Sequence, residues 1–227
     1  MSSNLQSFLP SYFLPRWSLR LSVFLLLLVH VSGAIGIAFF NRAFFVGYTP
    51  LNLLLMFILL LWNETELNLS LLKAFIVAFG AGLITEIIGV NTGILFGSYH
   101  YGDVFGEKIF GVPLLIGLNW FCIAYAAYQV VMILPKSWQL SKVGIALSTA
   151  VLATIFDWIM EPVAIELGFW QWHTAEIPFL NYVCWFGISF VIAFVFQWTA
   201  VKKSNLFAVY LFITQFLFFL FLGLVGS

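Results

Sequence analysis

Residues 206–225 read LFAVYLFITQFLFFLFLGLV and contain no acidic or basic side chain. A transmembrane helix needs about 20 mostly apolar residues to cross the hydrocarbon core of a bilayer, and this segment has that length. Six more apolar segments precede it, near residues 21–40, 48–62, 72–90, 112–134, 143–160 and 179–200. The sequence therefore predicts an all-α polytopic membrane protein with about seven transmembrane helices, which form a single integral-membrane domain over residues 1–227.

The composition of the whole chain supports this interpretation. Apolar residues make up 63% of the sequence and charged residues 8%, against about 45–50% and about 25% in soluble domains. So few charged side chains cannot cover a soluble domain of 227 residues. The formal net charge is zero, which gives no basic surface for nucleic acid. Cys122 and Cys184 both lie in apolar segments and indicate neither a disulfide framework nor a cysteine metal site.

The basic residues predict the orientation in the membrane, because cytoplasmic loops are enriched in Lys and Arg. If all seven segments cross, the side that holds the N-terminus carries seven basic residues: Arg16, Arg20, Lys73, Lys136, Lys142, Lys202 and Lys203. The other side carries only Arg42 and Lys108. We therefore expect the N-terminus to lie in the cytoplasm. We also expect the protein to be located in the inner membrane of a bacterium.

Three carboxylic acids fall within the predicted spans or at their outer ends. Glu86 and Asp157 lie at a similar depth in two spans that run in the same direction, and Glu161 follows Asp157 by one helical turn on the same face. Pro162 is expected to end that helix. An ionisable residue inside a span costs about 2.5–3.5 kcal/mol, which makes it a candidate for function. We expect these three residues to be catalytic; the alternative is a set of interfacial carboxylates that reach water or stabilise a helix end.

The expected chemistry follows from the surroundings of these acids. Desolvation favours the neutral form of a carboxyl group, and a second carboxylate nearby favours it further. A pair with one protonated and one ionised member is the arrangement that enzymes use for general acid catalysis at neutral pH.

The segments next to the acids suggest a binding site for an apolar substrate. Residues 89–113 contain repeated glycines interleaved with Phe and Tyr, which predicts a tightly folded loop that places aromatic rings over a cavity. An ordinary turn-rich loop is the alternative, and the tryptophans of the second loop, residues 168–173, are typical of membrane-interface anchors. The residues expected to bind substrate are Asn91, Tyr99, Tyr101, Asn119, Trp120 and Trp158.

Metal and redox chemistry are not indicated. His30, His100 and His173 are scattered, whereas the membrane di-iron oxygenases need clusters of histidine ligands. No dinucleotide-binding fingerprint is present either. We therefore expect no metal and no cofactor.

Two groups of residues in the loops and span ends form recognisable motifs. The first group is EIIGVNTGILFGSYHY at residues 86–101, followed by GVP at 111–113. The second is DWIMEP at residues 157–162 with GFWQW at 168–172. Both groups resemble the membrane family of carotenoid biosynthesis proteins, which includes carotenoid 1′,2′-hydratases and bisanhydrobacterioruberin hydratase. The similarity runs from about the third to the sixth span, and the heterodimeric-type lycopene cyclases look like distant relatives.

The resemblance implies hydration of the acyclic ψ end group of a carotenoid, such as lycopene, γ-carotene or a C50 carotenoid, without a metal or redox cofactor. It further implies a hydrophobic carotenoid substrate and membrane lipid as partners, together with association with other carotenoid enzymes, and no nucleic acid. A carotenoid cyclase, a small-molecule or proton-coupled transporter, and a non-catalytic carotenoid-binding protein stay open as alternatives. A retinal protein is disfavoured because residues 206–225 contain no lysine for a Schiff base.

Overall fold

The computed structural model describes residues 17–135, 140–199 and 205–226, and 76% of these residues are helical. Among them, six helices are long and apolar enough to cross a membrane, which confirms an all-α polytopic membrane protein. They are α1 (Trp17–Phe39), α4 (Leu69–Thr92), α5 (Leu114–Met132), α6 (Lys142–Glu166), α7 (Phe179–Trp198) and α8 (Leu206–Gly226).

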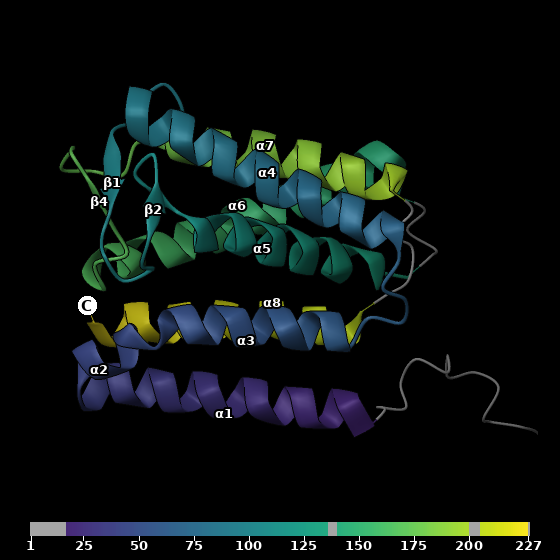
Figure 1. Ribbon diagram of the computed structural model, residues 1–227, viewed down its shortest axis with the longest axis horizontal. Helices are drawn as coiled ribbons and strands as arrows, with labels where there is room; N and C mark the ends of the chain where they lie inside the picture. Colours follow the sequence, from purple (N-terminus) through teal and green to yellow (C-terminus); the bar gives the residue numbers. More distant parts are fainter. Residues whose placement is uncertain (1–16, 136–139, 200–204, 227) are drawn as a thin grey trace, which may run out of the picture.

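The segment expected as the second span forms a shorter apolar helix, α3 (Thr49–Trp62). Its 14 residues extend about 21 Å, less than the roughly 30 Å of a hydrocarbon core. The short helix α2 (Arg42–Gly47) precedes it and is capped by Asn41, whose side chain accepts a hydrogen bond from the backbone of Phe44. Helix α3 nevertheless lies alongside the long helices of the bundle (Figure 1).

The helices lie side by side, and all the strands gather at one end of the bundle, which we call the strand end (Figure 1). Arg42 and Lys108 belong to α2 and β2 at the strand end, whereas Arg20, Lys73 and Lys142 lie near the first residues of α1, α4 and α6 at the opposite end. The other basic residues used for the orientation lie outside the described residues: Arg16, Lys136, Lys202 and Lys203. The chain thus crosses the bundle in alternating directions, while its orientation relative to the cytoplasm stays a prediction.

Helix α5 forms the centre of the bundle. Most of its side chains are buried, and it packs against α3, α4, α6, α7 and α8. Side chains near its beginning, including Trp120, therefore lie in the interior close to the strand end.

Two loops meet at the strand end through short antiparallel strands. Strand β1 (Tyr99–Tyr101) pairs with β4 (Trp170–Trp172), and β2 (Lys108–Ile109) pairs with β3 (Val112–Pro113). The loops approach so closely that a Cβ atom on Gly102 would lie 2.1 Å from the carbonyl oxygen of Gly168. A glycine at position 102 is therefore required for the two loops to meet.

The prediction that Pro162 ends its helix is wrong. Helix α6 continues through Pro162 to Glu166. Proline removes only one helical hydrogen bond, the one to the carbonyl of Trp158. The residues that follow Pro162 stay helical because Val163 and Ala164 are buried against the rest of the bundle.

Candidate active site

The pairing of β1 with β4 places four aromatic side chains on one face of a two-stranded sheet. Tyr99 lies opposite Trp172, and Tyr101 lies opposite Trp170. Successive side chains of a strand point to opposite faces, so the intervening His100 and Gln171 are exposed. The buried face thereby presents two phenol O–H groups and two indole N–H groups to the helices below it.

The two tyrosines donate hydrogen bonds to Glu86, near the end of α4. Tyr101 donates to Oε2 of Glu86 at 2.7 Å, and Tyr99 donates to the same oxygen. Burial, and then the neighbouring Glu86 carboxylate, raise the pKa of both tyrosines well above the usual range. Both side chains therefore remain protonated donors.

Trp120 of α5 completes the shell around Glu86. Its indole nitrogen donates to Oε1 of Glu86 at 2.9 Å. The indole ring lies directly against Gly82, one helical turn before Glu86, where a Cβ atom would come within 2.3 Å of the Trp120 ring. The ring also stacks on Trp185 of α7 with centroids 3.9 Å apart. The carboxylate of Glu86, which is 4% exposed, thus receives three hydrogen bonds.

The other two acids share one face of α6. Glu161 accepts hydrogen bonds at Oε2 from the indole nitrogens of Trp170 and Trp172, at 3.0 and 3.1 Å. The side-chain amide of Asn181 in α7 donates to Oδ2 of Asp157 at 2.7 Å and to Oε1 of Glu161 at 3.3 Å. Oδ1 of Asp157 is buried and has no hydrogen-bond partner among the described residues.

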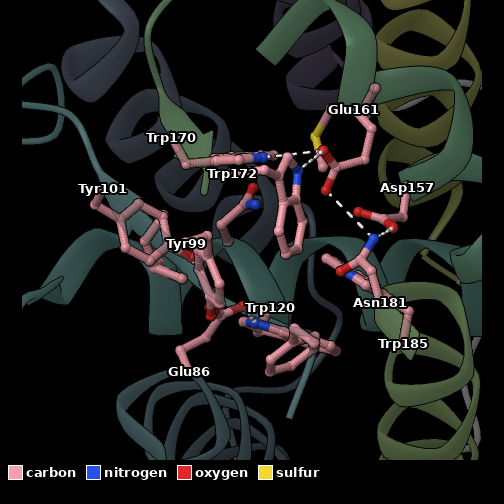
Figure 2. A pocket seen from close by; sticks show the side chains of 14 residues that line it. Glu86, Tyr99, Tyr101, Trp120, Asp157, Glu161, Trp170, Trp172, Asn181 and Trp185 are labelled. Carbon is pink, nitrogen blue, oxygen red and sulfur yellow. Dashed lines mark hydrogen bonds between the residues drawn. The ribbon is translucent and has the colours of Figure 1, made fainter. Parts of the chain in front are cut away.

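The three acids line one small cavity at the strand end, which we call the acid pocket (Figure 2). Its free space suffices for about one water molecule. Among the described residues that line it, none is Lys or Arg, so the acids face aromatic rings and neutral polar groups. Its lining consists of Glu86, Phe96, Tyr99, Tyr101, Ile116, Asn119, Trp120, Asp157, Met160, Glu161, Trp170, Trp172, Asn181 and Trp185.

Seven of the nine predicted site residues line the acid pocket: Glu86, Asp157, Glu161, Tyr99, Tyr101, Asn119 and Trp120. The other two lie elsewhere. Trp158 is 62% exposed, because it follows Asp157 directly and so points away from the face that carries the acids. Asn91 is exposed and donates hydrogen bonds to the carbonyls of Ile87 and Phe110, so it supports the loop.

Sequence reasoning missed the residues that hold the α6 acids. Trp170 and Trp172 were expected as interface anchors, but their indole nitrogens bind Glu161. Asn181 was not singled out, although an amide side chain three residues after Pro178, at the start of a span, was an available signal. Within the described part of the chain, no three His, Cys, Asp or Glu side chains are grouped so that they could hold a metal ion.

The chain is similar to known proteins of carotenoid metabolism. Residues 44–226 match the family described as "Carotenoid biosynthesis protein". A protein of Haloarcula japonica named "Bisanhydrobacterioruberin hydratase" is 30% identical over 104 residues, which cover 44% of this chain and 36% of that protein. The match thus spans little more than a third of the length of that relative. No solved structure matches the chain.

Proposed function

The chain belongs to the carotenoid biosynthesis protein family, and from this premise we propose that it adds water across the C-1′,2′ double bond of the acyclic ψ end group of a carotenoid. Membership of this family supports the view that the chain is a membrane enzyme that modifies carotenoids. The hydratase name of the Haloarcula japonica relative supports the reaction. Lycopene, γ-carotene and C50 carotenoids are all candidate substrates, because each can present the same end group.

The observation that carries the mechanism is the unpaired oxygen of Asp157 in the acid pocket. A carboxyl group that donates its proton to an alkene needs an O–H that no protein acceptor occupies. Oδ2 of Asp157 receives a hydrogen bond from Asn181, while Oδ1 has no partner among the described residues. We assign the general acid to Asp157, which protonates C-2′ and leaves a tertiary cation at C-1′.

Glu86 and Glu161 act as the anionic partners of this cation. Each carboxylate accepts three hydrogen bonds, which offset part of the cost of burying its charge. Fixed negative charge in a site of low dielectric stabilises a cation that develops in the transition state. The rings of Tyr99 and Tyr101 add π faces, each estimated at about 2 kcal/mol or more when desolvated.

Water completes the reaction. A water molecule attacks C-1′ and transfers one proton to Glu161. Glu161 and Asp157 lie one turn apart on α6 and share the amide of Asn181, so the pair holds one proton between the two groups, and its return to Asp157 restores the acid. In total one water is consumed: a hydrogen adds at C-2′ and a hydroxyl group at C-1′, and the proposed reaction needs no metal or redox cofactor.

A cyclase would use the same acid and the same cation, but an internal alkene would take the place of water. The acid pocket has room for about one water molecule beside the polar groups Asn119 and Asn181, which supports hydration over cyclisation.

The proposal is tested by pigment analysis in a bacterial host that makes lycopene or γ-carotene. Expression of the chain is expected to give a carotenoid heavier by one water, and the isosteric variant Asp157→Asn, matched for protein in the membrane, is expected to give none. A product of unchanged mass with shifted absorption would identify a cyclase. If the pigment were unchanged in the lycopene host and in the γ-carotene host, despite normal amounts of the protein in the membrane, both hydration and cyclisation would be contradicted.

A further inference from the structure

Two larger cavities follow the acid pocket in the direction of α1, α2, α3 and α8. The first, which we call the middle cavity, shares Asn119, Met160 and Trp170 with the acid pocket. The second, the lipid-side cavity, shares five residues with the middle cavity: His30, Ile37, Thr49, Asn52 and Phe218. Because the side chains at each boundary line both neighbouring cavities, the three cavities lie next to one another in a row.

The series widens from the acids outwards. The acid pocket has room for about one water molecule, the middle cavity for several times more, and the lipid-side cavity for more again. A substrate with a narrow reacting end and a long body fits such a funnel. The reacting end group would lie at the boundary formed by Asn119, Met160 and Trp170.

The walls suit a hydrocarbon chain. The middle cavity is lined by rings from several elements, including Phe105, Phe156, Phe169 and Phe219. Ligand sites typically combine such apolar walls with a few polar groups. One of these polar groups is Asn52, whose Oδ1 is buried without a partner among the described residues, so a hydroxyl group or a water beside the chain would pair with it.

The outer mouth faces the region where lipid is expected. The lipid-side cavity lies between α1, α2, α3 and α8, and Phe44 and Tyr48 at its edge are 56% and 52% exposed. The neighbouring surfaces of α1 and α3 carry exposed apolar side chains, such as Val31 and Leu51. A carotenoid dissolved in lipid can therefore enter sideways without crossing water.

We propose that the middle and lipid-side cavities are the binding site for the body of a linear isoprenoid chain, which enters from the bilayer between α1 and α3 and extends its end group to the acid pocket. This inference rests on the proposed function for the reacting end. The substrate would then enter on the side of α1, α2, α3 and α8, and not on the side of α4 and α7.

The test is to block the funnel without touching the acids. Ile37 is 8% exposed and lines both outer cavities, so Ile37→Trp is expected to fill them. The matched control is Ile35→Trp on the same helix, at a position that is 43% exposed and lines neither cavity. With lycopene, Ile37→Trp is expected to lower the yield of hydrated product at least tenfold, while the control keeps the yield of the parent chain.

A second variant guards against misfolding of Ile37→Trp. A Cβ atom on Gly33 would meet only Phe218, at 3.6 Å, so Gly33→Leu projects into the lipid-side cavity without a clash at its base. A short acyclic terpene with the same end group distinguishes a blocked site from general damage, because it does not need the outer cavities. Both variants are expected to impair lycopene turnover far more than turnover of the short chain.

Pigment that copurifies with the protein provides a readout that does not depend on hydration. In an Asp157→Asn background, Ile37→Trp and Gly33→Leu are expected to lose bound lycopene, whereas Ile35→Trp retains it.

The outcomes separate the two proposals. If the parent chain binds lycopene without hydrating it, and the blocked variants do not bind it, the proposed binding site is supported and the proposed reaction is wrong. If well-folded blocked variants bind and convert lycopene as the parent chain does, the proposed binding site is wrong and the reaction stands. If the parent chain itself binds no lycopene, the inference fails for this ligand.

Discussion

The side-chain amide of Asn181 donates a hydrogen bond to Asp157 Oδ2 at 2.7 Å, and the other oxygen of that carboxyl group has no partner among the described residues. The same amide lies 3.3 Å from Glu161 Oε1. Asn181 thus fixes the orientation of the proposed acid and joins it to its neighbour. Since Asn181 lies on α7 and both acids lie on α6, the packing of these two helices determines where the proton of Asp157 points.

The first prediction concerns this bridge. The variant Asn181→Leu keeps a similar volume but removes the donor, so kcat for hydration is expected to fall about 10- to 100-fold, since hydrogen bonds to charged groups contribute about 1.5–3 kcal/mol. The pH profile of kcat is expected to shift, because the two acids lose the donor that they share. Gln197→Leu is the control, since Gln197 lies at the other end of α7 and donates to the backbone carbonyls of Lys142 and Ala193. An unchanged kcat and pH profile in Asn181→Leu would contradict the bridging role.

The second prediction concerns the donors to Glu86. Tyr99→Phe removes one of three hydrogen bonds to a buried carboxylate, so hydration is expected to fall about tenfold or more, and the free energy of unfolding by about 1–3 kcal/mol. Tyr210→Phe on the exposed side of α8 is the control, because that residue is 45% exposed. Product yield and thermal unfolding in detergent measure the two effects. Equal behaviour of the two variants would contradict a role of Tyr99 beyond packing.

Much of the fold could be predicted because lipid imposes a simple rule on sequence. A run of about 20 apolar residues has few alternatives to a transmembrane helix, so the six long helices follow from hydropathy. The exact helix ends could not be predicted in the same way. Pro162 shows why: one lost hydrogen bond is small beside the packing that holds the residues up to Glu166.

The acids of the site could be predicted, but their partners could not. Glu86, Asp157 and Glu161 were recognisable since a carboxyl group is costly in a span. The pairing of Tyr99 with Trp172 depends on two loops that are about 70 residues apart in sequence, and no local pattern specifies that register. Trp158 was expected to bind substrate, but it follows Asp157 directly on α6, and adjacent residues of a helix point in different directions.

The third prediction tests why a glycine stands at position 82. A methyl group at this position would lie 2.3 Å from the Trp120 ring, so Gly82→Ala is expected to displace the ring and weaken its hydrogen bond to Glu86. Overpacking of this kind costs about 1–3 kcal/mol, and hydration is expected to fall with it. Gly80→Ala is a matched control on the same helix, since a methyl group there meets no atom within 4 Å. Product yield and the unfolding temperature in detergent measure the two effects. If Gly82→Ala were as stable and active as Gly80→Ala, the proposed close contact would be wrong.

A separate polar cluster lies at the end of the bundle opposite the strands. Glu64, just after α3, accepts hydrogen bonds at Oε1 from Tyr125 and from the side-chain amide of Asn205, the latter at 2.5 Å. The backbone N–H of Asn205 donates to Gln129 of α5 at 3.1 Å. The cluster connects the end of α3 with α5 and with the start of α8, so its protonation is expected to affect stability.

The fourth prediction is the pH dependence of this cluster. Burial raises the pKa of Glu64 above its ordinary value of 4.5, and the hydrogen bonds from Tyr125 and Asn205 offset part of that effect. Below the ordinary pKa, Glu64 is protonated in both the folded and the unfolded chain, and its contribution to stability is complete. As the pH rises through the raised pKa of the folded state, the unfolded chain releases the proton more readily, so this contribution is lost.

Glu64→Gln cannot titrate, and we expect its unfolding temperature in detergent to exceed that of the parent chain by a margin that grows from about pH 5 upwards. The matched control is Glu176→Gln, which makes the same substitution at an exposed position outside this cluster. A margin for Glu64→Gln that stayed constant or shrank as the pH rose would show that the folded state does not raise the pKa of Glu64.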